Sequence, residues 1–177
     1  SSVTDMTAMF NSCSGLKELD VSNFYAPNVT DLTSMFTGCS SLTSLDLSNL
    51  RPKKLEYFGS LVSGCSNLVN LNISNFDFSS LKSTSSFAGN NSDNFTVDMS
   101  NSNFSGLSEL SSMFSTISNI NLSGSNFTNA NLVRAFASPA IKTVDLRDSN
   151  FTNANMTDMF IGNSNLTSVN LSNANTL

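Results

Sequence analysis

Apolar and polar residues alternate along the chain in a pattern that repeats at a constant interval through its first part. Stretches 9–24, 35–50 and 61–76 have the same order of apolar, hydroxyl and acidic or amide residues, and Cys13, Cys39 and Cys65 are evenly spaced within them. A fixed period of roughly 20 to 50 residues is typical of a chain wound into stacked coils, because each coil buries its apolar face only against its neighbours. The pattern therefore predicts a solenoid.

Each repeat contains signals for two different walls. Leu19, Asp20 and Val21 alternate inward and outward as residues of a strand do. Upstream, Met6 and Phe10 are four positions apart, a spacing that suits one helical or 3₁₀ turn packed behind the strand. We therefore predict a coil with a strand on one wall and short helical or 3₁₀ turns on the other.

The repeats continue, with drift, through the sequence. The interval between equivalent phenylalanines is shorter from Phe114 to Phe136 than from Phe10 to Phe36, so we expect the perimeter of the coil to change. We predict a single solenoid domain over residues 1–177 and interpret it as a segment of a larger protein, because neither end has an obvious polar cap. The approximate repeats are 3–28, 29–54, 55–80, 81–106, 107–128, 129–152 and 153–177.

The later repeats contain a second, shorter period. The sequence SNFTNAN recurs between apolar residues spaced five apart, which are Leu122, Phe127 and Leu132 in one repeat and Leu146, Phe151 and Met156 in the next. This spacing resembles that of pentapeptide-repeat proteins, whose quadrilateral β-helix has one inward apolar residue on each side. A quadrilateral β-helix is therefore the alternative fold for the C-terminal half.

Composition favours many corners. Only 12% of residues are charged, about half the ~25% typical of globular chains, and Ser, Asn and Thr make up the difference. These residues favour turns, because their side chains compete for backbone hydrogen bonds. A β-rich solenoid suits this composition.

Several function classes are disfavoured. The chain has no histidine, which removes the usual general base and metal ligand, and its net charge of −5 argues against nucleic-acid or anionic-membrane binding. No apolar run approaches the ~20 residues that span a bilayer. We therefore expect no enzymatic activity, no cofactor and no direct membrane insertion.

The cysteine column has two interpretations. Stacked coils place equivalent residues about 4.8 Å apart, which falls within the range of Cα separations in disulfides. However, side chains in such a ladder point the same way, and Asn90 and Asn163 take the place of cysteine in later repeats. We predict buried, reduced thiols, with a strained disulfide as the alternative.

Polar side chains flank the inward residue of each predicted strand and form two outward columns on the strand wall. We consider two interpretations: a solvated ladder, or a face that binds a polar or cationic ligand. Carboxylate and amide oxygens also suit calcium, but the sequence lacks a calcium-loop motif, so we predict no metal site. The candidate ligand-binding residues are Glu18, Asp20, Ser44, Asp46, Asn70, Asn72, Asp98, Asn119, Asn121, Thr143, Asp145, Ser168 and Asn170.

The repeat MF-x-x-C-x-x-L-x-x-LD-[VL]-SN-[FL] resembles that of BspA-like leucine-rich-repeat bacterial surface proteins, in the variant common in lactic acid bacteria, other Gram-positives and mycoplasmas. The resemblance implies a right-handed, leucine-rich-repeat-type coil of about seven repeats, each of roughly 22–27 residues. It also implies an extracellular, cell-surface location, anchored by parts outside this segment, and adhesion to a host cell-surface protein, a matrix protein or a glycan.

Two functional hypotheses follow. The first is a monomeric adhesion module that binds through its strand wall and attaches more strongly to anionic surfaces in acid. The second is a passive spacer within a surface protein. The polar loop 90–94 (NNSDN) is an alternative location for binding.

Overall fold

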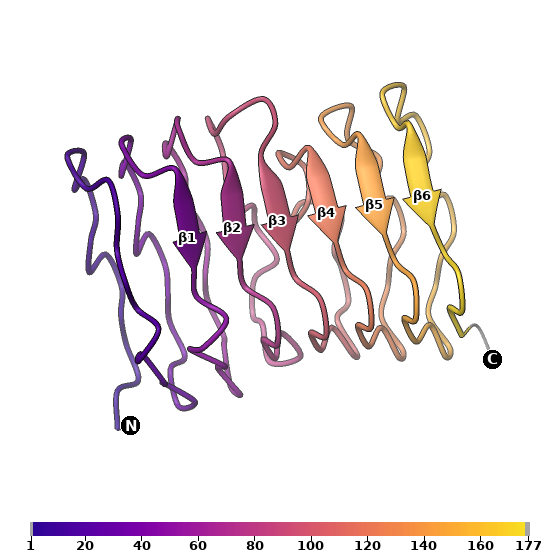
Figure 1. Cartoon of the computed structure of the whole chain (residues 1–177). Coiled ribbons are helices and arrows are strands. Elements are labelled where there is room, and N and C mark those ends of the chain that lie inside the picture. Colours follow the sequence, from indigo (N-terminus) through magenta and orange to yellow (C-terminus); the bar gives the residue numbers. More distant parts are fainter. Residues whose placement is uncertain (1, 176–177) are drawn as a thin grey trace.

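The computed structural model describes residues 2–175 and is a parallel β-solenoid (Figure 1). One short strand from each coil after the first adds to a single parallel sheet, so the order of the strands in the sheet is the order in the sequence. This confirms the predicted β-rich solenoid. The strands are β1 (Ser44–Asp46), β2 (Asn70–Asn72), β3 (Thr96–Asp98), β4 (Asn119–Asn121), β5 (Thr143–Asp145) and β6 (Ser168–Asn170).

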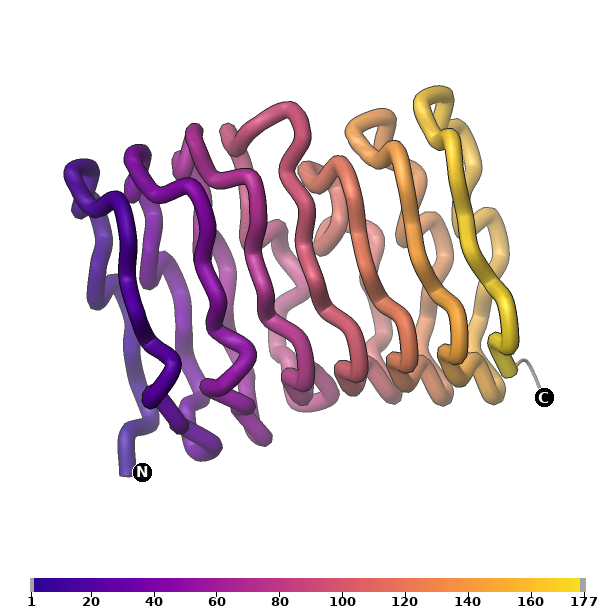
Figure 2. Tube along the Cα trace, viewed as in Figure 1, coloured from indigo at the N-terminus to yellow at the C-terminus, as the bar shows by residue number. Residues whose placement is uncertain are grey.

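The sheet register follows the sequence period. Leu45 pairs with Leu71 and Leu71 with Val97, one full period further along in each case, and the later strands follow at slightly shorter intervals. The central residue of each strand points inward, and the central residues of β1 to β5 are buried. The coils therefore stack in register along the whole solenoid (Figure 2).

The first coil precedes β1 and contributes no strand. It is joined to the second coil by an isolated parallel bridge between Asp5 and Asp31 on the opposite wall. Its side chains are more exposed than those of the inner coils: Met9 is 52% exposed, whereas its equivalent Met35 is fully buried. In this structure, the first coil contacts a neighbouring coil on one side only.

The prediction of helical or 3₁₀ turns on the back wall was wrong, because no helix occurs in residues 2–175. The backbone there alternates between two kinds of hydrogen bond. The N–H groups of Met6, Ala8 and Phe10 donate to carbonyls of the next coil, whereas those of Met9 and Asn11 donate three positions back within the coil. A helix would need every amide for internal bonds. In the stacked coils, every second amide instead donates to a carbonyl of the next coil, so the backbone forms consecutive turns and no helix.

The core contains two ladders of stacked phenylalanines. Within each ladder the ring centroids lie about one coil spacing apart, for example 5.0 Å between Phe104 and Phe127 and 5.2 Å between Phe127 and Phe151. The other ladder includes Phe136, whose ring centroid lies 5.3 Å from that of Phe160. These rings fill the space between the walls and couple each coil to its neighbours.

The interior changes between the two halves. At one corner, Leu50 and Phe76 of the early coils are replaced in register by buried Ser102, Ser125 and Ser149. The hydroxyls of Ser125 and Ser149 each donate to a backbone carbonyl of the preceding coil, at 3.2 and 3.0 Å. A small residue two positions before an inward phenylalanine fits the five-residue pattern, so the later coils agree with the pentapeptide-repeat alternative.

The described residues include no helix long and apolar enough to cross a membrane.

Candidate functional site on the strand wall

The structure places the predicted outward residues side by side in two columns on one wall. Sheet pairing aligns the predicted residues of β1 to β6, whereas Glu18 and Asp20 lie one coil earlier, before β1, and are exposed. Thr96 also belongs to this face and was missed, although it is equivalent to Asn70 in the next repeat. We call this set the strand-wall face; it comprises Glu18, Ser44, Asn70, Thr96, Asn119, Thr143 and Ser168, and beside them Asp20, Asp46, Asn72, Asp98, Asn121, Asp145 and Asn170.

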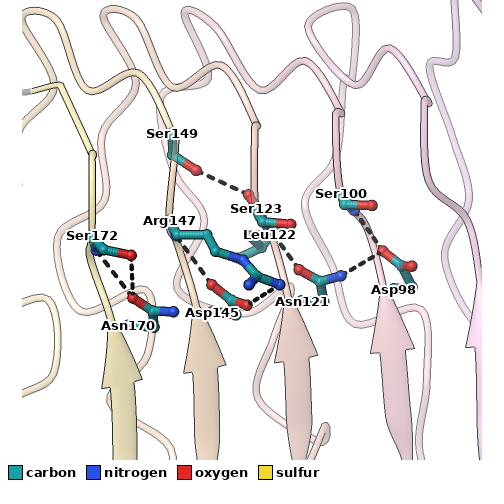
Figure 3. A network of polar contacts seen from close by, with 10 residues as sticks. All are labelled: Asp98, Ser100, Asn121, Leu122, Ser123, Asp145, Arg147, Ser149, Asn170 and Ser172. Carbon is teal, nitrogen blue, oxygen red and sulfur yellow. Dashed lines mark hydrogen bonds and ion pairs between the residues drawn. The ribbon is translucent and has the colours of Figure 1, made fainter.

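Every Asp or Asn of the second column forms an Asx turn. Its Oδ1 accepts the backbone N–H of the residue two positions later, at 2.9–3.1 Å, as Asp98 does from Ser100 and Asn170 from Ser172 (Figure 3). This bond turns the chain at the end of the strand. The column therefore has a structural role, and in the aspartates the second carboxylate oxygen is not used by the turn.

Side chains of neighbouring coils are also joined on this face, most extensively around β3 to β5. Asn121 donates from Nδ2 to Asp98 Oδ1 at 3.2 Å (Figure 3), and Thr143 donates its hydroxyl to Asn119 Oδ1 at 2.9 Å. On the earlier coils, the Asp46 side chain makes only its Asx turn within residues 2–175. Around Asp46 the polar groups are therefore more available to a ligand.

The charges on the second column are spaced by amides. Aspartates on adjacent coils occur only at Asp20 and Asp46, since Asn72 and Asn121 separate the later ones. Two carboxylates ~5 Å apart in water repel by about 1 kcal/mol, so this arrangement limits repulsion. Hydrogen bonds from the Ser22 hydroxyl, and then from its backbone N–H, lower the pKa of Asp20, which keeps this carboxylate ionised in mild acid.

Arg147 adds one positive charge beside the column. Its guanidinium lies 3.1 Å from the Asp145 carboxylate (Figure 3), and both side chains are partly exposed. Such a surface pair contributes little to stability. It does reduce the acidic character of the face near β5 relative to the coils around Asp20 and Asp46.

The cysteines lie at the corner that precedes the strand wall, and all three are free. Cys39 and Cys65 are buried, and the thiol of each donates to the carbonyl of a residue in the preceding coil at 3.1 Å. Burial raises the pKa of Cys65 to about 11. The prediction of buried thiols was wrong for Cys13, which is exposed on the first coil.

In two later coils, an asparagine side chain makes the hydrogen bond to a backbone carbonyl that the cysteine thiol makes in the earlier coils. Asn91 donates from Nδ2 to Val62 O at 2.9 Å, and Asn163 donates to Phe136 O at 3.1 Å. The assignment of Asn90 to this position was wrong by one residue, since Asn91 makes the bond that corresponds to that of the Cys65 thiol. Asparagine therefore replaces cysteine at this corner, and the thiol itself is not required.

The loop 90–94 lies against a later coil. Ser118 donates its hydroxyl to Asp93 O at 2.8 Å, and the Lys142 ammonium donates to the same carbonyl at 3.1 Å. These bonds span two coils and hold the loop down, so it extends the rim of the solenoid and remains a second candidate surface. Within residues 2–175, no group of three or more His, Cys, Asp or Glu could hold a metal ion.

Comparison with known families divides the chain in two. Residues 1–92 and 45–143 match the family described as "Mycoplasma protein of unknown function, DUF285", and residues 145–175 match "Pentapeptide repeats (8 copies)". No curated protein matches. The pentapeptide match contains the second set of residues spaced five apart, Leu146 to Met156, and the inward Ser149. The first family covers the repeats that contain the cysteines, and also the first such set, Leu122 to Leu132. The chain belongs to the DUF285 family of repeat-containing Mycoplasma proteins of unknown function.

Proposed function

We propose that the chain is a binding module that recognises a polar or cationic macromolecular ligand through its strand-wall face. The observation that carries this proposal is the row of Asx turns. Each turn fixes the orientation of a carboxylate or amide at one-coil intervals, so the face presents its oxygens without the entropy cost of ordering flexible side chains.

The location and partner are a further part of the proposal. The repeats resemble those of BspA-like leucine-rich-repeat surface proteins, and the family match is to a repeat-containing family. We therefore place the module on the outside of a bacterial cell, where its partner is a host cell-surface protein, a matrix protein or a glycan. A monomer suffices, because the inner coils bury their apolar residues against their neighbours within the chain.

The structure offers a variant that removes charge without removing the turns. Asn72, Asn121 and Asn170 form the same Asx turn as the aspartates. The triple variant Asp46→Asn, Asp98→Asn, Asp145→Asn should therefore fold like the wild type and lose binding to a cationic ligand.

A screen of glycans and matrix proteins on the isolated chain identifies the ligand, and the triple variant is then compared with the wild type on it. The expected result is at least a tenfold loss of affinity with an unchanged thermal midpoint. Equal affinity of the two proteins would remove the strand-wall aspartates from the binding site. As a control, Lys53→Gln changes a charge at a corner away from this face.

Acid should strengthen attachment to anionic surfaces. The sequence pI is about 4.4, so lowering the pH from 7 to 4 removes the net negative charge and leaves a small net positive charge. Because the pKa of Asp20 is lowered, the Asx turn at Asp20 should stay intact between pH 7 and pH 4. The stability that Asp20 contributes is present above the pKa of the carboxyl in the unfolded chain, and it is lost only as the pH falls through the lower pKa of the folded chain. Equal attachment to anionic vesicles at pH 4 and 7 would refute this expectation.

A passive spacer is the second candidate, and one observation favours it. The Asx turns give the polar columns a structural reason to exist without a ligand. The spacer hypothesis predicts that the wild type binds no ligand in the screen, and that a substitution which removes the Asx acceptor, such as Asp98→Ala, changes stability alone.

A further inference from the structure

The back wall of the solenoid is interrupted between the fourth and fifth coils. Between the second and third coils and between the sixth and seventh, this wall is held by backbone bonds, such as Leu32 N–H to Tyr57 O at 2.9 Å and Phe136 N–H to Met159 O at 2.9 Å, whereas among the described residues 109–116 form none with 132–137 of the sixth coil. Within residues 2–175, no backbone hydrogen bond joins 83–88 to 109–116. The strand wall remains fully paired at the same level. The interruption is therefore confined to one face.

Two small side chains lie on the fourth-coil side of this interruption. Thr84 stands where coils on either side have large apolar residues, since its equivalents are Phe58 in the preceding repeat and Leu110 in the following one. Likewise, Ala88 is the equivalent of Phe114, which belongs to one of the phenylalanine ladders. The fourth coil thus has smaller side chains at these two positions of its back wall, and the wall does not close against the fifth coil.

The phenylalanine rings of the back wall pair away from the interruption. Phe87 of the fourth coil stacks on Phe58 of the third, with 5.0 Å between ring centroids. Phe114 of the fifth coil stacks on Phe136 of the sixth, with 5.1 Å between ring centroids. Phe114 also makes an edge contact with Phe104 of the fourth coil, at 6.3 Å between ring centroids, but among the described residues no ring contact joins Phe87 to Phe114.

A slot of about 310 Å³ occupies this position. One side is lined by Lys82, Ser83 and Thr84 and the other by Ser108 and Glu109. The N–H and C=O groups of Thr84 and Glu109 make no hydrogen bond within the described residues. Both sides of the slot therefore offer main-chain donors and acceptors as well as hydroxyl groups.

The slot is closed at both ends, which limits the length of a ligand. At one end Phe78 N–H donates to Asn103 O at 2.8 Å, and at the other the hydroxyls of Ser86 and Thr116 are 3.2 Å apart. The volume is at the lower end of the ~300–1,000 Å³ typical of ligand pockets. A compact ligand fits this space, and a continuous polymer chain does not.

The charges in the slot already have partners. Lys82 lies 2.6 Å from the Glu56 carboxylate and over the ring of Tyr57, and the Glu109 carboxylate accepts a short hydrogen bond from the Ser111 hydroxyl. An ionic ligand would have to displace one of these partners. A neutral ligand with several hydroxyl groups can use the serines, the threonine and the free main-chain groups, and it can place its C–H face against the two leucines that also line the slot, Leu81 and Leu107.

We propose that this slot is a binding site for a single neutral pyranose, as a free sugar or as the terminal residue of a glycan. It lies on the wall opposite to the strand-wall face and does not depend on that face for its chemistry. The affinity is expected to be millimolar, because one sugar ring offers few contacts and the slot is open to water.

Chemical-shift mapping tests the proposal. D-glucose, D-galactose and N-acetyl-D-glucosamine are titrated separately into the ¹⁵N-labelled chain, and the expected result is a saturable shift of the Thr84 and Glu109 amides with at least one sugar. Thr84→Leu fills the slot with the residue type found at the equivalent position of the next coil. This variant should reduce the affinity at least tenfold while keeping or raising the thermal midpoint.

Thr33→Leu is the matched control, because it adds the same group to the back wall of the second coil and should leave the sugar response unchanged. Ser108→Leu blocks the slot from its other side and serves if Thr84→Leu fails to fold. Absence of a saturable shift with all three sugars overturns the proposal. A sugar response that survives both blocking variants also overturns it. Free glycine serves as a non-sugar probe of the main-chain groups, and a response to glycine without a response to any sugar likewise overturns the proposal.

The same titration separates this proposal from the proposed function. The triple asparagine variant of the strand-wall face should keep the sugar response. Loss of the sugar response in that variant would assign the sugar to the strand wall and would refute the slot as its site.

Discussion

Replacing Asp98 tests whether the outward aspartates hold the coil together or only carry charge. Asp98 is half-buried and accepts two hydrogen bonds through Oδ1, from Ser100 N–H at 2.9 Å and from Asn121 Nδ2 at 3.2 Å (Figure 3). Asp98→Ala removes the acceptor of both bonds. Asp98→Asn keeps an oxygen in the same position and removes only the charge.

The two substitutions should differ clearly in stability. A hydrogen bond of this kind contributes about 0.5–1.5 kcal/mol net, so Asp98→Ala should lower the free energy of unfolding by about 1–3 kcal/mol. Asparagine already makes both bonds elsewhere: Asn121 forms the turn at 3.1 Å, and Asn103 accepts an amide bond from Asn126 at 3.1 Å. Asp98→Asn should therefore cost less than about 0.5 kcal/mol.

Thermal unfolding followed by circular dichroism measures the difference. In a chain of this length, a change of about 1 kcal/mol shifts the midpoint by about 2–4 °C, so Asp98→Ala should unfold several degrees below Asp98→Asn. Asp46→Ala is the internal comparison, because Asp46 makes the turn alone and should lose about half as much. Equal midpoints for the Ala and Asn variants at position 98 would refute the structural role assigned to the column.

Three further predictions concern other parts of the fold. Cys13 should react with a thiol reagent at neutral pH, whereas the buried Cys65 should stay protected. The stability that Cys65 contributes should be complete below its ordinary pKa of 9.0 and should be lost as the pH rises towards 11, which unfolding at pH 8 and at pH 11 measures. Gly124→Ala should lower the free energy of unfolding, measured in urea, by about 1–2 kcal/mol or more, because φ is +68° and the new Cβ would lie 2.5 Å from a side-chain oxygen of the neighbouring coil. Gly106→Ala is the control for the backbone contribution alone, since φ is +71° there and the Cβ would enter open space; a larger loss of stability at Gly106 than at Gly124 would contradict the argument. Backbone amides within 109–116 should exchange with deuterium faster than those of the bonded back wall, and equal protection would show that the interruption closes in solution.

Much of the fold could be predicted because the period is visible in single residues. Leu45, Leu71 and Val97 are equivalent in the sequence and pair in the sheet. The outward column containing Asp46 and Asp98 follows from the same register, since side chains alternate along a strand. The candidate residues could therefore be assigned to one wall without knowledge of the coil's cross-section.

The back wall could not be predicted in the same way. The spacing of Met6 and Phe10 fits a helical turn as well as it fits successive β-turns, and the sequence does not show which amides bond to the next coil. The left-handed backbone at Ala8 and Ser34 is likewise a result of stacking, because neither residue type favours a positive φ by itself. The corner asparagine, in contrast, could have been assigned from the sequence, because Asn91 lies one full period after Cys65, as Val97 does after Leu71.

The sequence by itself determined the solenoid, the inward and outward positions of the strand wall and the change of repeat in the C-terminal part, because all three depend on the spacing of residue types along one chain. The tertiary structure decided how the coils meet. Asx turns use one oxygen of each outward Asp or Asn, an asparagine can replace a buried thiol, and a slot lies between the fourth and fifth coils. These features depend on contacts between residues of different coils. A hydrogen bond or a gap between coils depends on the relative position of two walls. The period alone does not specify that position, so these features could not be predicted from the sequence.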